Sequence, residues 1–430
     1  MRSTLMVRMR LDMNAGDLVR VFGPAVLKVE SGRVSVLGAE LSRDNVFSIG
    51  RSRSYVVKSL ELSTVDVELS EASRVEVSSP EEEPYDEWVE VADSIISSCY
   101  GPCTVMVLGP VDAGKSSFAA ILANRSLASG LRPAIIDADV GQADIGPPGF
   151  VGLAMPSTWV SWIRELEPLM LKFIGSIEPS PLIGRIIASC VELKSMALKE
   201  GADIVIVDTD GWVEGWSALE YKIDLAKALE VDHAVVIGYD DLSNYFSKSF
   251  PGSVYSLVRP MVQAVRSPED RRRLRQDNYR RFIEGDIVEV DLNKVAVQGS
   301  CLSGYEAKNL LAHITPELED ARVINVIKYP GGICIYIESD KSLPPQTLKE
   351  LQKKIGGEVI VVSEESAIGT LAALRDEKDF DCPAVLVGID LESRKAKFKT
   401  KCRGPFKLVS FSRVKLSEDY KELSRGRILL

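Results

Sequence analysis

Short apolar runs alternate with longer amphipathic stretches through the middle of the chain. Apolar runs of strand length occupy residues 105–108, 134–139, 202–207 and 232–238. Glycine or acidic residues mark the end of each run. Residues 117–128 and 182–198 instead place apolar side chains at roughly helical spacing. Because strands that alternate with helices tend to pair in parallel beneath those helices, the pattern predicts a central α/β sheet.

The two ends of the chain have a different pattern. Residues 1–78 contain short β-branched runs separated by Gly, Ser and Asp turns, which predict a small all-β region. From about residue 286, strand-like runs such as 323–327 and 333–337 predict a β-rich α+β region. We therefore expect an N-terminal β domain (1–80), a central α/β domain (81–285) and a C-terminal domain (286–430).

Composition is typical of a soluble globular protein. The 430 residues are 45% apolar, and no apolar run approaches the roughly 20 residues that cross a bilayer, so we expect no membrane partner. The N-terminus shows no secretory signal. Seven cysteines, an odd number without a CxxC pair, argue against a disulfide scaffold or a structural zinc site and predict a reducing, cytoplasmic location.

The strongest motif follows the first central strand. Residues 109–116 read GPVDAGKS and fit the phosphate-binding loop pattern GxxxxGK[ST], so the central sheet is expected to be of the P-loop NTPase type. Lys115 can reach the β- and γ-phosphates of ATP, and the Ser116 hydroxyl can bind Mg²⁺. A chance match is disfavoured by the flanking strand and helix. The expected nucleotide-binding residues are Gly109, Pro110, Asp112, Ala113, Gly114, Lys115, Ser116 and Ser117.

Two acidic residues end the second central run. Asp137 and Asp139 are two positions apart, so on a strand they point the same way and should face the Mg²⁺ and triphosphate. We expect Asp137 to support the metal together with Ser116, and Asp139 to accept a proton. In the alternative, one acid acts on metal-bound water and the other only caps a turn. The Gly- and Pro-rich loop that follows, with Gln142 near its start, is placed to line an acceptor cleft.

A second polar cluster ends the third central run at residues 208–213, which read DTDGWV. Thr209 and the Gly211 N–H could hold a phosphate group. Trp212 offers a flat face on which a nucleobase can stack. The alternative is that Trp212 fills the core beside the helix expected at 219–229.

Basic residues concentrate beyond the central sheet. Residues 266–281 contain seven arginines against three acids, and Arg271 and Arg275 share a face if the segment is helical. Such arginines can stabilise a transferring phosphoryl group or bind a nucleic-acid backbone despite the net charge of −10. The alternative is a solvated helix with surface ion pairs. Lysines 395, 397, 399 and 401 alternate and predict a modest basic stripe on one strand face.

Read together, GPVDAGKS (109–116), DADVGQ (137–142), DTDGWV (208–213) and the arginine segment resemble the polynucleotide 5′-hydroxyl kinase family. That family includes archaeal RNA/DNA kinases and eukaryotic relatives in pre-mRNA cleavage and pre-rRNA processing. The resemblance implies transfer of the γ-phosphate of ATP, with Mg²⁺, to the 5′-hydroxyl end of RNA or DNA. It implies catalytic roles for Lys115, Asp139, Arg271 and Arg275, and contacts to the acceptor from Gln142, Thr209, Gly211 and Trp212.

The sequence departs from the eukaryotic relatives at Asp208, often Asn there, and at Asp210, often uncharged or Cys there. An extra negative charge near a phosphate-binding loop bears on substrate preference. A second interpretation is an ATP-bound scaffold in an RNA-processing complex, although Lys115, Asp139 and the arginines favour activity. A regulatory GTPase is disfavoured because residues 238–241 lack an NKxD motif.

Overall fold

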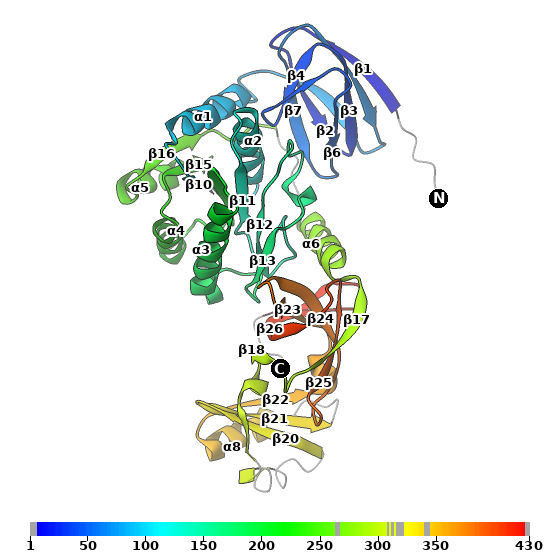
Figure 1. The fold of residues 1–430 in the computed structure, drawn as a ribbon, viewed down its shortest axis with the longest axis vertical. Helices are drawn as coiled ribbons and strands as arrows, with labels where there is room; N and C mark the ends of the chain where they lie inside the picture. Colours follow the sequence, from blue (N-terminus) through cyan, green and yellow to red (C-terminus); the bar gives the residue numbers. More distant parts are fainter. Residues whose placement is uncertain are drawn as a thin grey trace. The chain divides into compact units, whose positions relative to one another are not determined.

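The chain forms two compact units in the computed structural model, which describes residues 7–262, 267–307, 309–310, 314, 322–338 and 345–425 (Figure 1). The first unit contains residues 1–146, 151–170 and 179–273, and the second contains 147–150, 171–178 and 274–430. The last change between units along the chain falls within helix α6 (Pro268–Ile283), between Arg273 and Leu274. The expected division into three domains stays a prediction, and Arg266 lies outside the described residues.

The N-terminal region of the first unit is built from two β-sheets. Its described strands are β1 (Val7–Met13), β2 (Leu18–Phe22), β3 (Ala25–Ser31), β4 (Arg33–Val36), β5 (Ala39–Ser42), β6 (Val46–Ile49), β7 (Ser54–Ser59), β8 (Ser63–Leu69) and β9 (Arg74–Ser78). The sheet orders are β1-β8-β3-β6 and β5-β4-β7-β2-β9. Alternate residues of β3 and β8 are buried, as expected for strands with one face on a core. The all-β pattern predicted for this region is confirmed.

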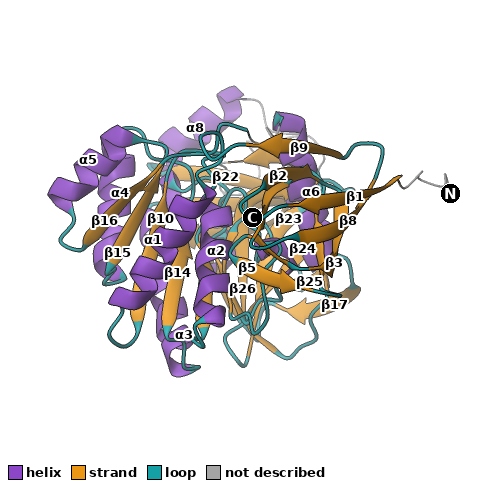
Figure 2. Ribbon diagram, turned by 90° about the horizontal axis from the view of Figure 1, so that it is seen from above, coloured by secondary structure: helices purple, strands orange, loops and turns teal. Residues whose placement is uncertain are grey.

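A seven-stranded sheet has the order β13-β12-β11-β14-β10-β15-β16. Its strands are β10 (Cys103–Leu108), β11 (Pro133–Asp137), β12 (Phe150–Ala154), β13 (Met170–Phe173), β14 (Ile204–Asp208), β15 (His233–Ile237) and β16 (Ser253–Leu257). Figure 2 shows its strands β16, β15, β10 and β14 side by side. Strands β11, β14, β10, β15 and β16 pair in parallel, which confirms the predicted sheet. One boundary was wrong: β11 ends at Asp137, so Asp139 lies in the following loop.

Helices cover both faces of this sheet. They are α1 (Tyr85–Ser98), α2 (Lys115–Ala128), α3 (Ile183–Lys199), α4 (Trp216–Ala228) and α5 (Asp240–Ser249). Helix α1 packs on α2, and α3 packs on α4. The crossovers through α2 and α4 run in opposite directions along the sheet, so right-handed connections place these two helices on opposite faces (Figure 1).

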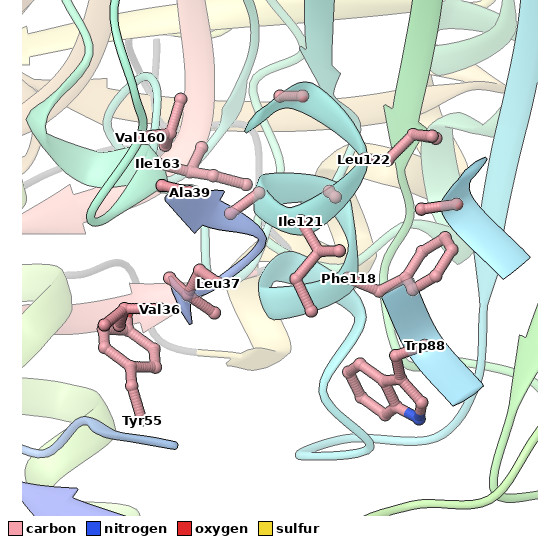
Figure 3. Close-up of a cluster of buried hydrophobic side chains, with 14 of the residues drawn as sticks. Val36, Leu37, Ala39, Tyr55, Trp88, Phe118, Ile121, Leu122, Val160 and Ile163 are labelled. Atoms are coloured by element: carbon pink, nitrogen blue, oxygen red, sulfur yellow. The ribbon is translucent and has the colours of Figure 1, made fainter. Parts of the chain in front are cut away.

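The N-terminal β region shares a hydrophobic core with α1 and α2 (Figure 3). Leu37 and Tyr55 from that region belong to the same buried cluster as Ile121 of α2. Trp88 of α1 meets Phe118 of α2 edge-on, with ring centroids 5.9 Å apart. Apolar packing therefore holds the N-terminal β region against the helix that begins at the glycine loop.

The second unit is rich in β-structure, as predicted. One sheet has the order β17-β25-β24-β23-β26-β18, with β27 paired to β26, and a four-stranded sheet has the order β19-β20-β21-β22. The elements are β17 (Asp286–Asp291), β18 (Ala296–Gln298), β19 (Tyr305–Glu306), β20 (Arg322–Tyr329), β21 (Gly332–Glu338), α8 (Pro345–Ile355), β22 (Glu358–Ser363), α9 (Glu364–Ala367), β23 (Thr370–Asp376), β24 (Asp381–Asp390), β25 (Lys395–Thr400), β26 (Phe406–Leu416) and β27 (Glu422–Arg425).

The first three lysines of the stripe, Lys395, Lys397 and Lys399, lie on β25, where they alternate with buried residues, and Lys401 follows the end of that strand. Two of these lysines face acids of the same unit. Lys395 lies 3.9 Å from Glu289, and Lys399 forms an ion pair with Glu284. These acids offset part of the positive charge of the stripe.

Disulfide bonds correct the expectation drawn from the cysteine count. Cys99 bonds to Cys103, and Cys382 bonds to Cys402. In the first pair, a tight turn links the end of α1 to the start of β10. In the second, two neighbouring antiparallel strands bring distant positions to a Cα separation of 6.1 Å. The separations of 4 and 20 residues between the bonded cysteines match no known sequence motif. The number of cysteines therefore no longer supports a reducing compartment. Among the described helices, none combines the length and apolar character that crossing a membrane requires.

Candidate functional site

A cleft lies in the first unit, at the carboxyl ends of β10, β11 and β14. Parallel sheets usually bind ligands at this edge. The glycine loop contributes residues 111–117 to the lining. The loops that follow β11 and β14 contribute Asp137, Asp139, Gln142, Asp208, Thr209 and Gly211, and helix α6 contributes Arg271. The structure therefore brings together most of the residues that the sequence singled out, although they come from distant parts of the chain.

Close packing explains both glycines of the loop. Gly114 has φ +104°, and a Cβ atom there would lie 2.7 Å from the Trp88 ring. Gly109 has φ +151°, and its Cβ would lie 2.7 Å from the carbonyl oxygen of Ile237. Only glycine accepts these conformations without strain at such distances. The loop backbone is thereby held in a curve that can surround phosphate groups.

Lys115 is almost fully buried at the start of α2. Its Nζ atom donates hydrogen bonds to the carbonyl oxygens of Gly109, at 3.0 Å, and Pro110, at 2.9 Å. Burial lowers the pKa of Lys115, while the nearby carboxylates of Asp208 and Asp139 act to raise it. Both hydrogen-bond acceptors are neutral carbonyl groups, so neither carries a charge that offsets the ammonium group.

Asp137 organises the loop that follows β11. Its Oδ2 atom accepts N–H groups from Asp144, at 2.5 Å, and Ile145, at 2.9 Å, and its Oδ1 atom accepts the Asp139 N–H at 3.1 Å. Burial, reinforced by Asp208 and Asp144, holds the pKa of Asp137 well above its usual range. Both oxygens are engaged by the backbone, which corresponds to the capping role that the sequence left open. A direct bond from Asp137 to a metal would have to compete with these three N–H groups.

Asp139 has a different environment. Its Oδ1 atom accepts N–H groups from Gly141 and Gln142, both at 2.9 Å, and no hydrogen bond to Oδ2 is recorded among the described residues. Burial raises the pKa of Asp139, with a further contribution from Asp210. A fixed carboxylate that lines the cleft and has a raised pKa is suited to accept a proton.

Asp208 is a site residue that the sequence prediction missed. It is buried at the end of β14, opposite Asp137 in the parallel register, and its Oδ1 atom has no hydrogen-bond partner in the described structure. Burial raises the pKa of Asp208 to about 6, while Lys115 and a hydrogen bond from Ser116 oppose the shift. The argument applied to Asp137, an acid at a strand end, would have identified it. An orphaned carboxylate oxygen beside a P-loop serine fits a divalent cation.

The loop after β14 lies against the glycine loop. A Cβ atom on Gly211 would lie 2.6 Å from Cγ2 and 2.8 Å from the backbone nitrogen of Val111. Thr209 lines the cleft but is fully buried, and its hydroxyl donates to the Val107 carbonyl at 2.8 Å. Any phosphate contact from this residue would therefore use its backbone rather than its hydroxyl.

Trp212 is half-buried and is not among the residues that line the described cleft. Its ring stacks on Tyr221, with centroids 6.1 Å apart and planes at 28°. The indole is therefore neither fully buried in the core nor fully exposed. One face of the indole is supported from within the protein.

Arg271 and Arg275, which were expected to act together, contact different parts of the protein. Arg271 lines the cleft, and its Nη2 atom lies 2.6 Å from Oδ2 of Asp112 in the glycine loop. Arg275 is not brought to the cleft; its guanidinium binds Glu422 through bonds of 2.7 Å and 3.1 Å. Residues four apart on a helix share a face only approximately, and no sequence pattern links Arg275 to the distant Glu422.

The N-terminal region also lines the cleft, through Arg20 and residues 52–56. Arg20 forms a buried ion pair with Glu83. Arg53 donates to Asp144 at 2.9 Å, and Arg164 donates to the other oxygen of Asp144 at 3.0 Å. No motif marks these residues in the sequence, because their roles depend on the packing of the two β-sheets against α2.

Parts of this chain are similar to known proteins. Residues 109–285 match the family model of the mRNA cleavage and polyadenylation factor CLP1 P-loop, which confirms the resemblance inferred from the motifs. A polyribonucleotide 5′-hydroxyl-kinase from Pyrococcus furiosus is 34% identical over 214 residues, covering 50% of this chain and 60% of that protein. One from Methanocaldococcus jannaschii is 25% identical over 341 residues, covering 77% and 91%.

The chain spans 58–60% of the length of the relatives from Pyrococcus and Thermococcus. It also matches the polyribonucleotide 5′-hydroxyl-kinase Clp1 of Gallus gallus, with 30% identity over 42% of this chain and 45% of that protein. These alignments cover only parts of the chain, so the similarity holds for those parts.

Solved structures share the fold over nearly the whole chain. A chain of the Clp1p–Pcf11p complex gives a TM-score of 0.62 at 14% identity, over 95% of this chain and 98% of that chain. A second structure of the Clp1p–Pcf11p interface, which also concerns ATP loss in a point mutant, gives a TM-score of 0.63 over 95% and 99%. The predicted fold class is confirmed.

Proposed function

We propose that this chain, whose residues 109–285 carry the P-loop domain of the CLP1 type, is a polynucleotide 5′-hydroxyl kinase. It transfers the γ-phosphate of ATP to the 5′-hydroxyl end of RNA or DNA. The observation that carries the proposal is the position of Asp139: a half-buried carboxylate lines the same cleft as Lys115, Ser116 and Arg271. The names of the archaeal relatives support the choice of acceptor.

ATP is proposed to bind with its phosphates along the glycine loop, residues 109–117. Leu37, Tyr55 and Trp88 form an apolar wall of the cleft, to which the base can bind. Ser116 and Asp208 would hold Mg²⁺, because the Asp208 Oδ1 atom lacks a protein partner and Ser116 hydrogen bonds to that carboxylate. Asp137, expected to support the metal, would act by fixing the loop around Asp139. When bound, Mg²⁺ would neutralise charge on the phosphates.

The acceptor end is proposed to approach from the loops after β11 and β14. Gln142, the backbone of Thr209 and Gly211, and the ring of Trp212 would orient it. The terminal 5′-oxygen attacks the γ-phosphorus and its proton passes to Asp139, while the bond to the β,γ-bridging oxygen breaks and ADP leaves. Lys115 and Arg271 neutralise negative charge that spreads over the transferring group.

Partners and location follow from these substrates. RNA or DNA ends are the proposed macromolecular ligands, and the relatives solved with Pcf11p show that this fold can assemble with a protein partner. ATP and nucleic-acid ends occur together inside cells, which supports a cytoplasmic location.

The test is transfer of labelled γ-phosphate to matched RNA and DNA oligonucleotides with 5′-hydroxyl ends. Controls are the same oligonucleotides with 5′-phosphate ends, a free nucleoside, and no acceptor. We expect label only on 5′-hydroxyl oligonucleotides. Stoichiometric ATP binding without transfer to any acceptor would instead favour the scaffold interpretation, and label on the nucleoside alone would indicate a small-molecule kinase.

A further inference from the structure

We propose that Lys222, on α4, is a positioning residue for the nucleic-acid end, which it fixes indirectly by anchoring the loop that carries Trp212. This inference rests on the proposed function, because it assigns the acceptor to that loop. Lys222 does not line the described cleft, and nothing in its surrounding sequence suggests a role.

The anchor is a buried ion pair. The Lys222 side chain is 0% exposed and that of Asp210 is 6% exposed, with Nζ and Oδ2 2.8 Å apart. The same Nζ atom lies 3.3 Å from the backbone carbonyl oxygen of Asp210. Lys222 therefore holds both the side chain and the backbone of the residue at the centre of the loop.

Asp210 passes this constraint to Trp212. Its second oxygen, Oδ1, accepts the Trp212 N–H at 2.9 Å. One carboxylate thus connects a lysine inside the protein to the backbone of the tryptophan. Without Lys222, the carboxylate would lose its fixed orientation, and the N–H of Trp212 would lose a fixed acceptor.

The neighbouring residue on α4 holds the ring of the same tryptophan. Tyr221 stacks on Trp212, and the Lys222 ammonium lies 4.5 Å from the centre of the Tyr221 ring. Two successive residues of one helix therefore restrain Trp212, at its backbone through Asp210 and at its indole through Tyr221. A ring held in this way needs less ordering when a base stacks on it, which improves binding.

The pair also accounts for the negative charge at position 210. Asp210 lies close enough to Asp139 to raise the pKa of that carboxylate, so an unpaired charge there would repel a phosphate. Lys222 neutralises it from the side away from solvent. Buried ion pairs are often dispensable for stability, because two matched neutral residues can replace them. The effect on the fold can therefore be separated from the effect on the acceptor.

The experiment compares full-length Lys222→Met, Lys222→Arg and the double variant Asp210→Asn with Lys222→Met. Lys194→Met is the matched control, since Lys194 lies on the adjacent α3, is largely buried and donates to the Leu229 carbonyl at 2.6 Å. Acceptor KM, ATP KM, kcat and the melting temperature are measured. The Kd of a 5′-hydroxyl oligonucleotide carrying a 3′ fluorophore is measured by anisotropy.

We expect Lys222→Met to raise acceptor KM and Kd about tenfold, the lower part of the range for loss of one base–aromatic stack, with ATP KM changed less than about twofold. Lys222→Arg should recover part of the affinity. The double variant removes both charges, so it should regain stability but keep the raised acceptor Kd. Lys194→Met should change stability only.

A double variant that folds and binds the acceptor as tightly as the wild type would overturn the inference, even if Lys222→Met does not fold. If the wild type binds the oligonucleotide but transfers no phosphate, the proposed kinase function fails while the Kd values still test Lys222. If the wild type does not bind the oligonucleotide, both proposals fail.

Discussion

Arg271 of α6 contacts Asp112 of the glycine loop, with 2.6 Å between the guanidinium and the carboxylate. This ion pair brings a residue 159 positions away in sequence to the loop that is proposed to bind ATP. Its partner on the helix, Arg275, is engaged instead with Glu422. The two arginines should therefore have separable effects when each is replaced.

Arg271→Ala is expected to reduce kcat on the order of 10³-fold, because it removes a positive charge from the transferring phosphoryl group. Arg275→Ala should leave kcat within about threefold and reduce the free energy of unfolding by roughly 1.5–3 kcal/mol, since it removes the charge-assisted hydrogen bonds between Arg275 and Glu422. Steady-state kinetics and denaturant unfolding measure the two effects. Equal losses of kcat in both variants would show that the helix acts as the sequence suggested.

Asp139→Asn tests the proton acceptor. The amide oxygen of Asn can still accept the N–H groups of Gly141 and Gln142, so the loop should keep its conformation. We expect kcat to fall about 10²–10⁴-fold, as is usual for loss of a general base, with the Kd of ATP unchanged. Loss of ATP binding to the same extent would show that Asp139 supports the nucleotide rather than the proton transfer.

The pH dependence should reflect Asp208. Burial raises the pKa of this carboxylate to about 6, so it becomes protonated as the pH falls through that value. A protonated carboxyl cannot hold a cation well, and activity should therefore decline below about pH 6 rather than near pH 4. Because Mg²⁺ favours the ionised form, higher Mg²⁺ concentrations should move the decline to lower pH. If the pH at which activity declines does not change with the Mg²⁺ concentration, Asp208 is not a ligand of the metal.

Gly211→Ala should disturb the glycine loop, because Gly211 packs against that loop although it lies far from it along the chain. The added methyl group would meet the backbone of Val111, which can move only by shifting the phosphate-binding backbone. We expect the Kd of ATP to rise about tenfold, measured by calorimetry. Gly184→Ala in α3 is the control, because its Cβ meets no atom within 4 Å and alanine favours a helix.

Local pattern was enough to predict the central sheet and the glycine loop. The strands and α2 follow from apolar runs and from the GPVDAGKS motif, whose residues are neighbours in sequence. The ion pair between Arg275 and Glu422, the hydrogen bond from Arg53 to Asp144, and the disulfide between Cys382 and Cys402 depend on long-range packing. For these features, residue type and spacing carry no signal, and a single sequence could not have shown them.

Asp137 illustrates an intermediate case. Its place at the end of a strand was read correctly, but two roles fit the same residue type. Only the three backbone N–H groups that surround its carboxylate favour capping over direct metal binding. Within the described structure, the Oδ1 atom of Asp208 has no hydrogen-bond partner, which favours metal binding over capping for this residue.

The Thr209 hydroxyl is turned inward, where it donates to Val107. The loop after β14 would therefore meet an incoming strand with main chain and one flat indole, and an indole can stack on any base. On the proposed function, the protein would accept any terminal nucleotide with similar ease. Its choice among nucleic acids would then depend on the sugar and on how freely the terminal nucleotide can unstack, rather than on the base sequence.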